Sequence, residues 1–467
     1  MKTHAVMAAL SLFLFPLQSW SFSSWDNKNN PENWDRSTGL NYERTFSKLP
    51  REGKLSDKSW SGDYWPTYKG GITYRWNKTT GEDSQKWYYE LLNKESLKDI
   101  KVEELSPAEK YDLYRGDLNF TLTKYERKRT RIFKTVKDSS EYDPEFKIPT
   151  WEGLCHSWAP ATIAYKDPEA VTLKNKDGLE IKFGSSDIKA LLTYHLHINK
   201  SQTHFLGSRC NLDFAKLTEE YENNKITKEE LEEKIESSAC QDVNAGAFHV
   251  VLTNQIAKRD EGFIVDVTRD SEVWNQAVTG FSTKVLDTVE GASEGAAPGT
   301  VREVKVNTIM TYIVEIPQHW NKITNHKSFL TTENYLYNLE LDQDNKVIGG
   351  SWISHSRPDF IWKRDRVNFQ GFFGPLGKIY RKSSKYDLEK KVRSLGRKEI
   401  IKKRFLETFQ NVMTKRKVKK ASLKIQAIKA LEEKLQKKIN KDKLLLKIKK
   451  GVKTYSIQNK FLKELKK

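Results

Sequence analysis

The sequence predicts an α+β fold, because its helix and strand signals occur in separate blocks. Ser106-Pro107-Ala108-Glu109 has the pattern of a capping box with proline at the first helical position, and predicts a short helix through Tyr114. Residues 301–316 and 335–353 are strand-like, and the second segment folds back at Asp344-Asn345. The chain has 467 residues, 37% of them hydrophobic and 11% aromatic, which excludes wholesale disorder and permits a large core.

Further elements are expected in the middle of the chain. Residues 171–183 alternate between apolar and polar around Asp177-Gly178, which predicts a β-hairpin. Ser186 or Asp187 then caps a mostly apolar segment, residues 188–192, which we interpret as a helix.

Two histidines, His195 and His197, follow this segment. They share a face if the segment is a strand, and such a pair suits a metal ion. Because no third ligand is apparent nearby, we expect no metal site.

The net charge of +19 is concentrated at one end of the chain. Residues 381–467 hold 31 of the 81 Lys+Arg residues but only 8 of the 62 Asp+Glu residues, a net charge of +23 that leaves −4 for the rest. The charge of the main body therefore gives no indication of nucleic-acid binding. In the tail, apolar residues recur every three or four positions among lysines, which predicts amphipathic helices with a basic surface.

Three interpretations of this Lys-rich tail stay open. It packs on the body as a solvated helical hairpin, or it binds an anionic cell wall, membrane surface or nucleic acid through contacts that salt would weaken. In the third interpretation it is a cleavable or self-crosslinking lysine segment.

The N-terminus has the pattern of a secretory signal peptide. Met1 and Lys2 precede an apolar run over residues 5–17, and Gln18-Ser19-Trp20-Ser21 completes the pattern. We expect cleavage after Ser21 and a secreted, periplasmic or extracellular protein. The apolar run is too short to span a bilayer, and no later run approaches about 18 apolar residues.

The chain has three cysteines, so only one intramolecular disulfide can form. Cys210 and Cys240 flank a polar insertion with a capped helix over residues 228–237, whereas Cys155 lies in an aromatic run. The economical pairing is Cys210 with Cys240, which leaves Cys155 free. A lone thiol in an oxidising compartment is a candidate nucleophile, and the alternative is an inert buried cysteine.

Cys155 opens a predicted helix of small and apolar residues. A thiolate at a helix N-terminus is stabilised by unpaired backbone N–H groups, which can also bind the oxyanion of an attacked carbonyl. Gly153 allows a close approach of the chain just before the thiol. Pro160 would remove a hydrogen bond from this helix, which therefore starts at Ser157 or kinks.

Two further apolar segments each carry one reactive side chain. Residues 246–254 contain His249, and residues 262–268 contain Asp266. We interpret both as strands, and the short polar loop between them predicts an antiparallel hairpin with His249 beside Asp266.

Thiol, imidazole and carboxylate together predict a Cys155–His249–Asp266 triad. The imidazole would take the proton of the thiol, and the carboxylate would orient the imidazole. His156 neighbours the thiol in sequence but points elsewhere if Cys155 begins a helix, so we do not expect it to be the base. The structural alternatives are a satisfied core histidine and an aspartate that binds a loop.

These segments resemble the secreted transglutaminase elicitor family, whose fold is similar to that of papain-like cysteine enzymes. The resemblance covers roughly residues 25–380 and excludes the basic tail. The stretches that carry it are W-S-G-D-Y-W-P-T-Y-K-G-G-I-T-Y-R-W (60–76), S-P-A-E-K-Y-D-L (106–113), W-E-G-L-C-H-S-W-A-P-A (151–161), G-A-F-H-V-V-L-T-N (246–254), F-I-V-D-V-T-R-D-S-E-V-W-N-Q (263–276), I-G-G-S-W-I-S (348–354) and R-P-D-F-I-W (357–362).

The resemblance implies acyl transfer from a glutamine side chain to a lysine amine. Cys155 would form a thioester and release ammonia, with His249 as the base and Asp266 as the orienting carboxylate. Glutamine- and lysine-bearing proteins would be the substrates; the chemistry requires no cofactor, and calcium dependence stays open. Trp151, Trp158 and Trp274 could line a slot that excludes water, although each could equally belong to the core.

The predicted organisation has four parts. Residues 1–21 form the signal peptide, and residues 22–140 form an aromatic-rich region that wraps the core. Residues 141–380 form the papain-like catalytic domain, and residues 381–467 form the Lys-rich helical tail.

Two competing functions stay open. The same triad with water as the acceptor would give a papain-like cysteine protease or a glutamine deamidase. Alternatively, the chain is a non-catalytic secreted protein that binds a surface through its basic tail.

Overall fold

The computed structural model describes most of the chain between Trp25 and Ser384. The residues outside the description are 1–24, 27, 35–40, 57–58, 77–85, 94, 96–100, 210–211, 236–241, 269–271, 318–328, 366 and 385–467. The predicted signal peptide, the Cys210–Cys240 pair and the Lys-rich tail from residue 385 therefore lie outside the described residues. The chain divides into two units after Ser384.

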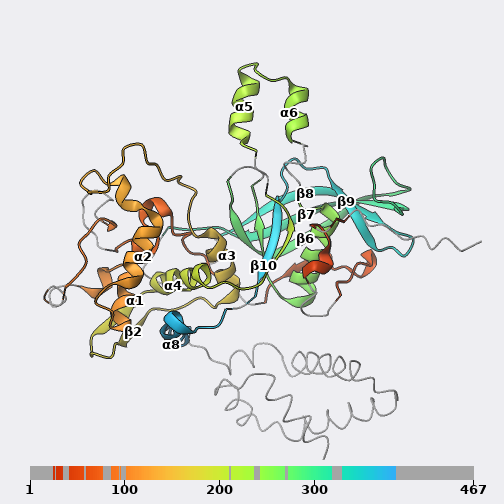
Figure 1. Ribbon diagram of the computed structural model, residues 1–467. Helices are drawn as coiled ribbons and strands as arrows, with labels where there is room; N and C mark the ends of the chain where they lie inside the picture. Colours follow the sequence, from red (N-terminus) through yellow and green to blue (C-terminus); the bar gives the residue numbers. More distant parts are fainter. Residues whose placement is uncertain are drawn as a thin grey trace, which may run out of the picture. The chain divides into compact units, whose positions relative to one another are not determined.

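An antiparallel sheet of eight strands forms one side of the described part (Figure 1). Its order is β4-β10-β5-β6-β7-β8-β9, and β1 pairs with β6. The strands are β1 (Glu52–Lys54), β4 (Thr203–Gly207), β5 (Phe263–Asp266), β6 (Asn275–Glu290), β7 (Arg302–Ile313), β8 (Leu330–Leu341), β9 (Val347–Trp352) and β10 (Phe360–Arg364). The strands expected after residue 300 are confirmed, and Asn345 has a φ of 57° in the turn between β8 and β9.

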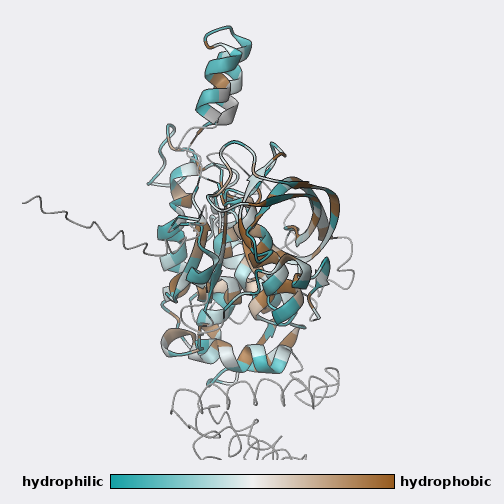
Figure 2. Cartoon of the chain, turned by 90° about the vertical axis from the view of Figure 1, so that its right-hand side faces the viewer, coloured by the Kyte–Doolittle hydropathy of each residue, from teal (hydrophilic) through white to brown (hydrophobic). Residues whose placement is uncertain are grey.

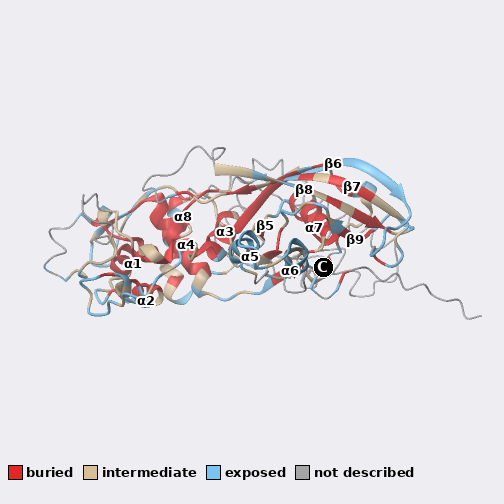
Figure 3. Ribbon diagram, turned by 90° about the horizontal axis from the view of Figure 1, so that it is seen from above, coloured by how far each residue is buried: buried red, intermediate tan, exposed pale blue. Residues whose placement is uncertain are grey.

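Helices gather mainly on the other side, with α3 between them and the sheet (Figure 1). They are α1 (Pro107–Arg115), α2 (Thr121–Thr130), α3 (Cys155–Ala164), α4 (Ser185–Ile198), α5 (Phe214–Glu222), α6 (Lys228–Ile235), α7 (Ala245–Leu252) and α8 (Gly374–Ser383). Helices α5 and α6 project away from the sheet as a pair and are largely exposed and hydrophilic (Figures 2 and 3). This combination of a sheet with separate helices confirms the α+β prediction.

The local signals at α1 and at the hairpin are confirmed. Ser106 Oγ accepts the Glu109 N–H at 3.2 Å, while the Glu109 carboxylate accepts the Ser106 N–H at 3.1 Å. This reciprocal capping box starts α1 at the proline that follows Ser106. The hairpin pairs β2 (Val171–Lys174) with β3 (Glu180–Phe183), and Gly178 supplies the positive φ of 83° that the turn requires.

Helix α4 begins two residues before the earliest start that the predicted caps, Ser186 or Asp187, allow. Its N-cap is Gly184, whose N–H donates to the Asp187 carboxylate at 2.7 Å, so Asp187 satisfies the helix end from inside the first turn. The helix then extends to Ile198 and includes His195 and His197. Residues two apart on a helix point about 200° apart, so the strand that a shared face of these two histidines would require is not present.

The segment that contains His249 is a helix, and the predicted strand is wrong. Asn244 caps α7 by accepting the N–H groups of Gly246 at 2.9 Å and Ala247 at 3.2 Å. A side chain at Gly246 would place its Cβ 2.1 Å from the Gly349 carbonyl oxygen, so only glycine lets α7 lie against β9. A short apolar run does not distinguish a buried strand from a buried helix, which explains the wrong prediction.

The sheet separates two apolar layers. On β5, Phe263 and Val265 join the core that contains α7, whereas Ile264 joins the core that contains Trp158 of α3. Because side chains alternate along a strand, α3 and α7 cover opposite faces of the sheet. A third cluster holds α1 and α4 together.

The Trp-rich N-terminal region packs onto all of these clusters. Trp34 lies in the α7 core, Trp60 in the α3 core and Trp65 in the helical cluster, and each is at most 1% exposed. These rings therefore serve packing rather than solvent-facing recognition.

Candidate functional site

Cys155 is the first residue of α3, and the chain before it is held by a neighbouring loop. The Leu154 N–H donates to the Tyr64 carbonyl at 2.6 Å, and the Thr67 N–H donates to the Glu152 carbonyl at 2.8 Å. A side chain at Gly153 would place its Cβ 2.5 Å from the Tyr64 ring, so glycine permits this close approach, as predicted. The helix starts at Cys155 although Pro160 lies inside it. The helix N-terminus is therefore fixed at the thiol.

The Cys155 thiol is 6% exposed and forms no disulfide. Its Sγ lies 3.5 Å from the Val273 carbonyl oxygen and 3.6 Å from Asn275 Nδ2. Burial raises the pKa of Cys155, and the charges of Glu315 and Asp266 raise it further, while hydrogen bonds from the backbone and side chain of Asn275 lower it. The thiol is thus held in its protonated form, and Asn275 is the group that favours the thiolate.

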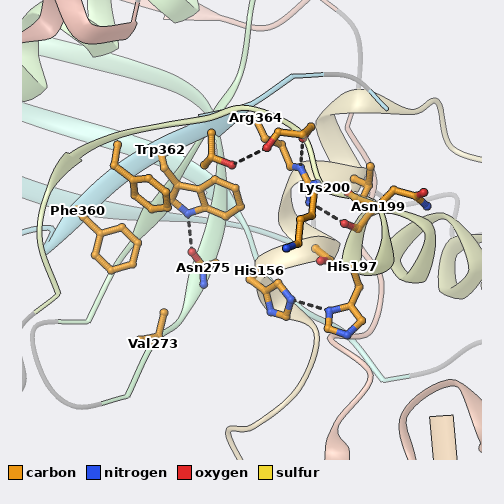
Figure 4. A pocket seen from close by; sticks show the side chains of 14 residues that line it. His156, His197, Asn199, Lys200, Val273, Asn275, Phe360, Trp362 and Arg364 are labelled. Atoms are coloured by element: carbon orange, nitrogen blue, oxygen red, sulfur yellow. Dashed lines mark hydrogen bonds between the residues drawn. The ribbon is translucent and has the colours of Figure 1, made fainter. Parts of the chain in front are cut away.

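Trp362 fixes the orientation of the Asn275 amide. Its indole Nε1 donates to Asn275 Oδ1 at 2.7 Å, and an indole N–H can only donate. The amide oxygen must therefore face Trp362 (Figure 4), and Nδ2 is turned toward Cys155. Neither Asn275 nor Trp362 was predicted from the sequence as a site residue, although both lie in stretches that carry the family resemblance. A polar residue at the start of an apolar strand was the available signal for Asn275.

Asp266 lies on the same face of the sheet as Cys155. It ends β5 directly opposite Asn275, two residues after Ile264, which packs in the α3 core. Asp266 is fully buried, and its Oδ1 accepts the Trp274 N–H at 2.9 Å and the Thr268 hydroxyl at 3.0 Å. The structure therefore brings Cys155 and Asp266 together.

His249 lies on the opposite face, in the α7 core. It is fully buried, and its Nδ1 lies 2.8 Å from the Tyr337 hydroxyl. Burial lowers the pKa of His249 to about 3, so the imidazole is neutral. The predicted hairpin beside Asp266 is wrong, because the segment forms a helix that the sheet separates from Cys155.

A pocket of about 470 Å³ lies beside the thiol (Figure 4). Val273 and Asn275, which contact Cys155 Sγ, both line it. Trp362 forms an aromatic wall and stacks against the half-exposed ring of Phe205, with 5.6 Å between the ring centroids. This volume is within the range of small-molecule and side-chain binding sites.

Two histidines meet at the edge of this pocket. His156 Nε2 and His197 Nδ1 lie 3.0 Å apart, and their rings point toward one another (Figure 4). Burial lowers the pKa of His156 to about 4 and that of His197 to about 3, so both are neutral near pH 7. His156, which the sequence argued against, therefore lies in the pocket beside the nucleophile candidate. Among the described residues, no cluster of three or more His, Cys, Asp or Glu side chains could hold a metal ion.

Arg364, which lines the pocket, forms hydrogen bonds to the C-terminal end of α4 and the residues that follow it. Its guanidinium donates to the carbonyls of Leu196 and Asn199, both at 2.8 Å, and to the Ser201 hydroxyl at 2.9 Å. These bonds satisfy carbonyls that the end of a helix leaves unpaired. Because α4 carries His197, Arg364 also holds that imidazole in place.

None of the three tryptophans expected to line a water-excluding slot is among the residues that line this pocket. Trp158 is fully buried in the core, which is the alternative that the sequence left open for it. Trp274 donates to the Glu272 carboxylate at 2.9 Å and contacts the Tyr64 ring, and Trp151 is half-buried. The pocket wall is formed by Trp362 instead.

In the part of the chain that the structure describes, no helix is sufficiently long and apolar to cross a membrane.

Comparisons with known proteins point to one family. The family model for the transglutaminase elicitor matches residues 33–369. The crystal structure of the GP42 transglutaminase from Phytophthora sojae is similar in fold, with a TM-score of 0.52 at 23% sequence identity. That match covers 78% of this chain and 99% of the GP42 chain. No curated protein matches the sequence.

Proposed function

Since this chain belongs to the transglutaminase elicitor family, we propose that it is a secreted protein-glutamine γ-glutamyltransferase with Cys155 as the nucleophile. The observation that carries the proposal is the environment of Cys155: a free thiol at the N-terminus of α3, with Asn275 donating to sulfur and a pocket alongside. The signal-peptide pattern of residues 1–21 supports secretion.

The first half-reaction forms a thioester. Cys155 gives up its proton, its sulfur attacks the side-chain carboxamide of glutamine, and the carbon–nitrogen bond breaks to release ammonia, which carries that proton away. We assign the proton transfers to the His156–His197 pair, because these imidazoles line the pocket beside Cys155 and are neutral near pH 7. Since burial lowers the pKa of both, an imidazolium would form only transiently and would pass the proton on to the leaving ammonia. His249 is not retained as the base, because it lies across the sheet.

The second half-reaction opens the thioester. A lysine amine attacks the acyl carbon, the carbon–sulfur bond breaks, and the proton lost by the amine returns to the thiol. The backbone N–H groups at the start of α3 and the Asn275 amide are donors for the oxyanion of both steps. Asp266 keeps the loop before β6 in place through its bond to the Trp274 N–H and so positions Asn275.

Hydrolysis is the second candidate function, because water can open the same thioester to give a deamidase, and the same nucleophile can cleave a peptide. The small exposed fraction of Cys155 favours an acceptor that enters after the donor has displaced water.

The test is incubation of the full-length protein with casein and a labelled primary amine. Label incorporation that is lost in Cys155→Ala supports transfer. Peptide fragments, or ammonia release without labelling, would establish hydrolysis. The same assay with added calcium and with a chelator decides the calcium dependence, since no step of the scheme requires a metal.

A further inference from the structure

We propose that the pocket beside Cys155 receives the glutamine donor, and that it selects donors with a carboxylate close to the reactive glutamine. The inference rests on the proposed function and names the substrate class of the same site. It is based on the side chains that line the pocket: those of the described residues are either positively charged or neutral, and none is acidic.

Two cations line the pocket without a carboxylate opposite them. Lys200 is exposed, and its amine points into the space between Trp362 and His156 (Figure 4). The Arg364 guanidinium bonds only to neutral oxygens, namely two carbonyls and a hydroxyl. Among the described residues, no ion pair joins either cation to an acidic side chain. A ligand carboxylate would therefore supply the missing negative charge.

The other polar groups of the pocket do not offset this positive charge. His156 and His197 are neutral near pH 7 because burial lowers the pKa of each. The walls formed by Trp362 and Phe360 are apolar and can hold the hydrocarbon part of a peptide. The site thus combines an apolar surface with an anion-binding rim.

The same charges argue against the amine acceptor as the occupant. A lysine substrate approaches as an ammonium ion, which Lys200 and Arg364 would repel. The carboxamide of glutamine is neutral and can approach Cys155 through the pocket without this cost. The pocket therefore distinguishes the donor from the acceptor before the chemical step.

The experiment uses three peptides that each contain one reactive glutamine. They carry Glu, Ala or Lys at the positions two residues before and two residues after that glutamine, and are otherwise identical. Full-length protein transfers each peptide to a fluorescent primary amine held at a fixed concentration. We expect kcat/KM to be about tenfold higher for the Glu peptide than for the Lys peptide at low salt, mainly through KM. The preference should shrink at about 0.5 M salt.

Lys200→Glu is the informative variant, because Lys200 is exposed and its replacement should not disturb folding. Lys200→Glu should abolish or reverse the preference for the Glu peptide. Lys182 is an exposed lysine on β3 outside the pocket, so Lys182→Glu should leave this preference unchanged. Equal kcat/KM values for the three peptides, or a preference that survives Lys200→Glu, would overturn the inference.

A binding measurement separates this inference from the proposed function. Fluorescence anisotropy of the labelled peptides with Cys155→Ala protein reports affinity without any reaction. If no peptide is transferred but the Glu peptide still binds more tightly, and loses this advantage in Lys200→Glu, the proposed function fails and only the carboxylate selectivity of the pocket stands. If transfer occurs without selective binding or kinetics, the inference fails and the proposed function stands.

Discussion

Replacing Asn275 by alanine should raise the pKa of the Cys155 thiol. The side-chain amide donates to Sγ over 3.6 Å, while the backbone N–H of residue 275, which also favours the thiolate, remains in the variant. A hydrogen bond to a charged group contributes about 1.5–3 kcal/mol, or roughly one to two pKa units. The contact to sulfur is long, so we expect the lower value, about one unit.

The assay is the rate of Cys155 alkylation by iodoacetamide as a function of pH. This reagent reacts with the thiolate, so below the pKa a rise of about one unit lowers the rate roughly tenfold. The assay is independent of glutamine transfer and therefore reports the thiol even if the proposed reaction is wrong. Ser282→Ala, on the exposed part of the same strand, is the matched control.

Two further variants test the role of Trp362 in this arrangement. Trp362→Phe keeps a ring in the wall but removes the donor that holds Asn275 Oδ1, so the amide can rotate and the pKa of Cys155 should rise by less than in Asn275→Ala. Asn275→Asp replaces the donor by a negative charge and should raise the pKa by more. An alkylation profile of Asn275→Ala within about 0.3 pH units of wild type, on the scale of the expected one-unit shift, would refute the reasoning.

Three other predictions concern the nucleophile, the misplaced histidine and a packing glycine. Cys155→Ala should abolish amine incorporation while changing the free energy of unfolding by less than about 1.5 kcal/mol, measured by urea denaturation. His249→Phe should leave the pH profile of amine transfer unchanged; an altered profile would restore His249 as the base. The pKa of His249 is about 3 in the folded protein, so only the unfolded chain binds this proton between about pH 6.5 and 3, and stability falls as pH falls through that range. His249→Phe should reduce that fall by up to about 1.4 kcal/mol per pH unit, measured by denaturation at several pH values. Gly246→Ala should destabilise the protein by more than about 2 kcal/mol, since the new Cβ would lie 2.1 Å from the Gly349 carbonyl oxygen, whereas Gly374→Ala, with no atom within 4 Å of its Cβ, should be nearly neutral in the same assay.

The elements that the sequence predicted correctly depend on neighbouring residues. Ser106 and Glu109 cap each other across one helical turn, and Gly178 supplies a positive φ within its own hairpin. The strand pattern after residue 301 is likewise a local alternation. Such signals act within a few residues of the chain and can be recognised without knowing the fold.

The same dependence on local signals separates the site residues that were predicted correctly from the one that was not. Cys155 and Asp266 lie on elements that the sequence could recognise, a helix start after a glycine and a short apolar strand, and the structure brings the two together. The nine-residue segment that contains His249 is otherwise apolar up to Leu252 and has no period that separates strand from helix. Its helical state depends on the Asn244 cap and on Gly246 against β9, a contact with residues about a hundred positions away.

The sequence by itself determined the separation of the acidic body from the basic tail, the α+β class, the family and the candidate nucleophile, because composition, local spacing and motifs are properties of the chain. Only the tertiary structure decided which polar groups meet that thiol. Asn275, Trp362 and the His156–His197 pair come from different elements, and no local pattern records that they lie around one pocket. The alternation of side chains across the sheet placed Asp266 on the face of Cys155 and left His249 on the other.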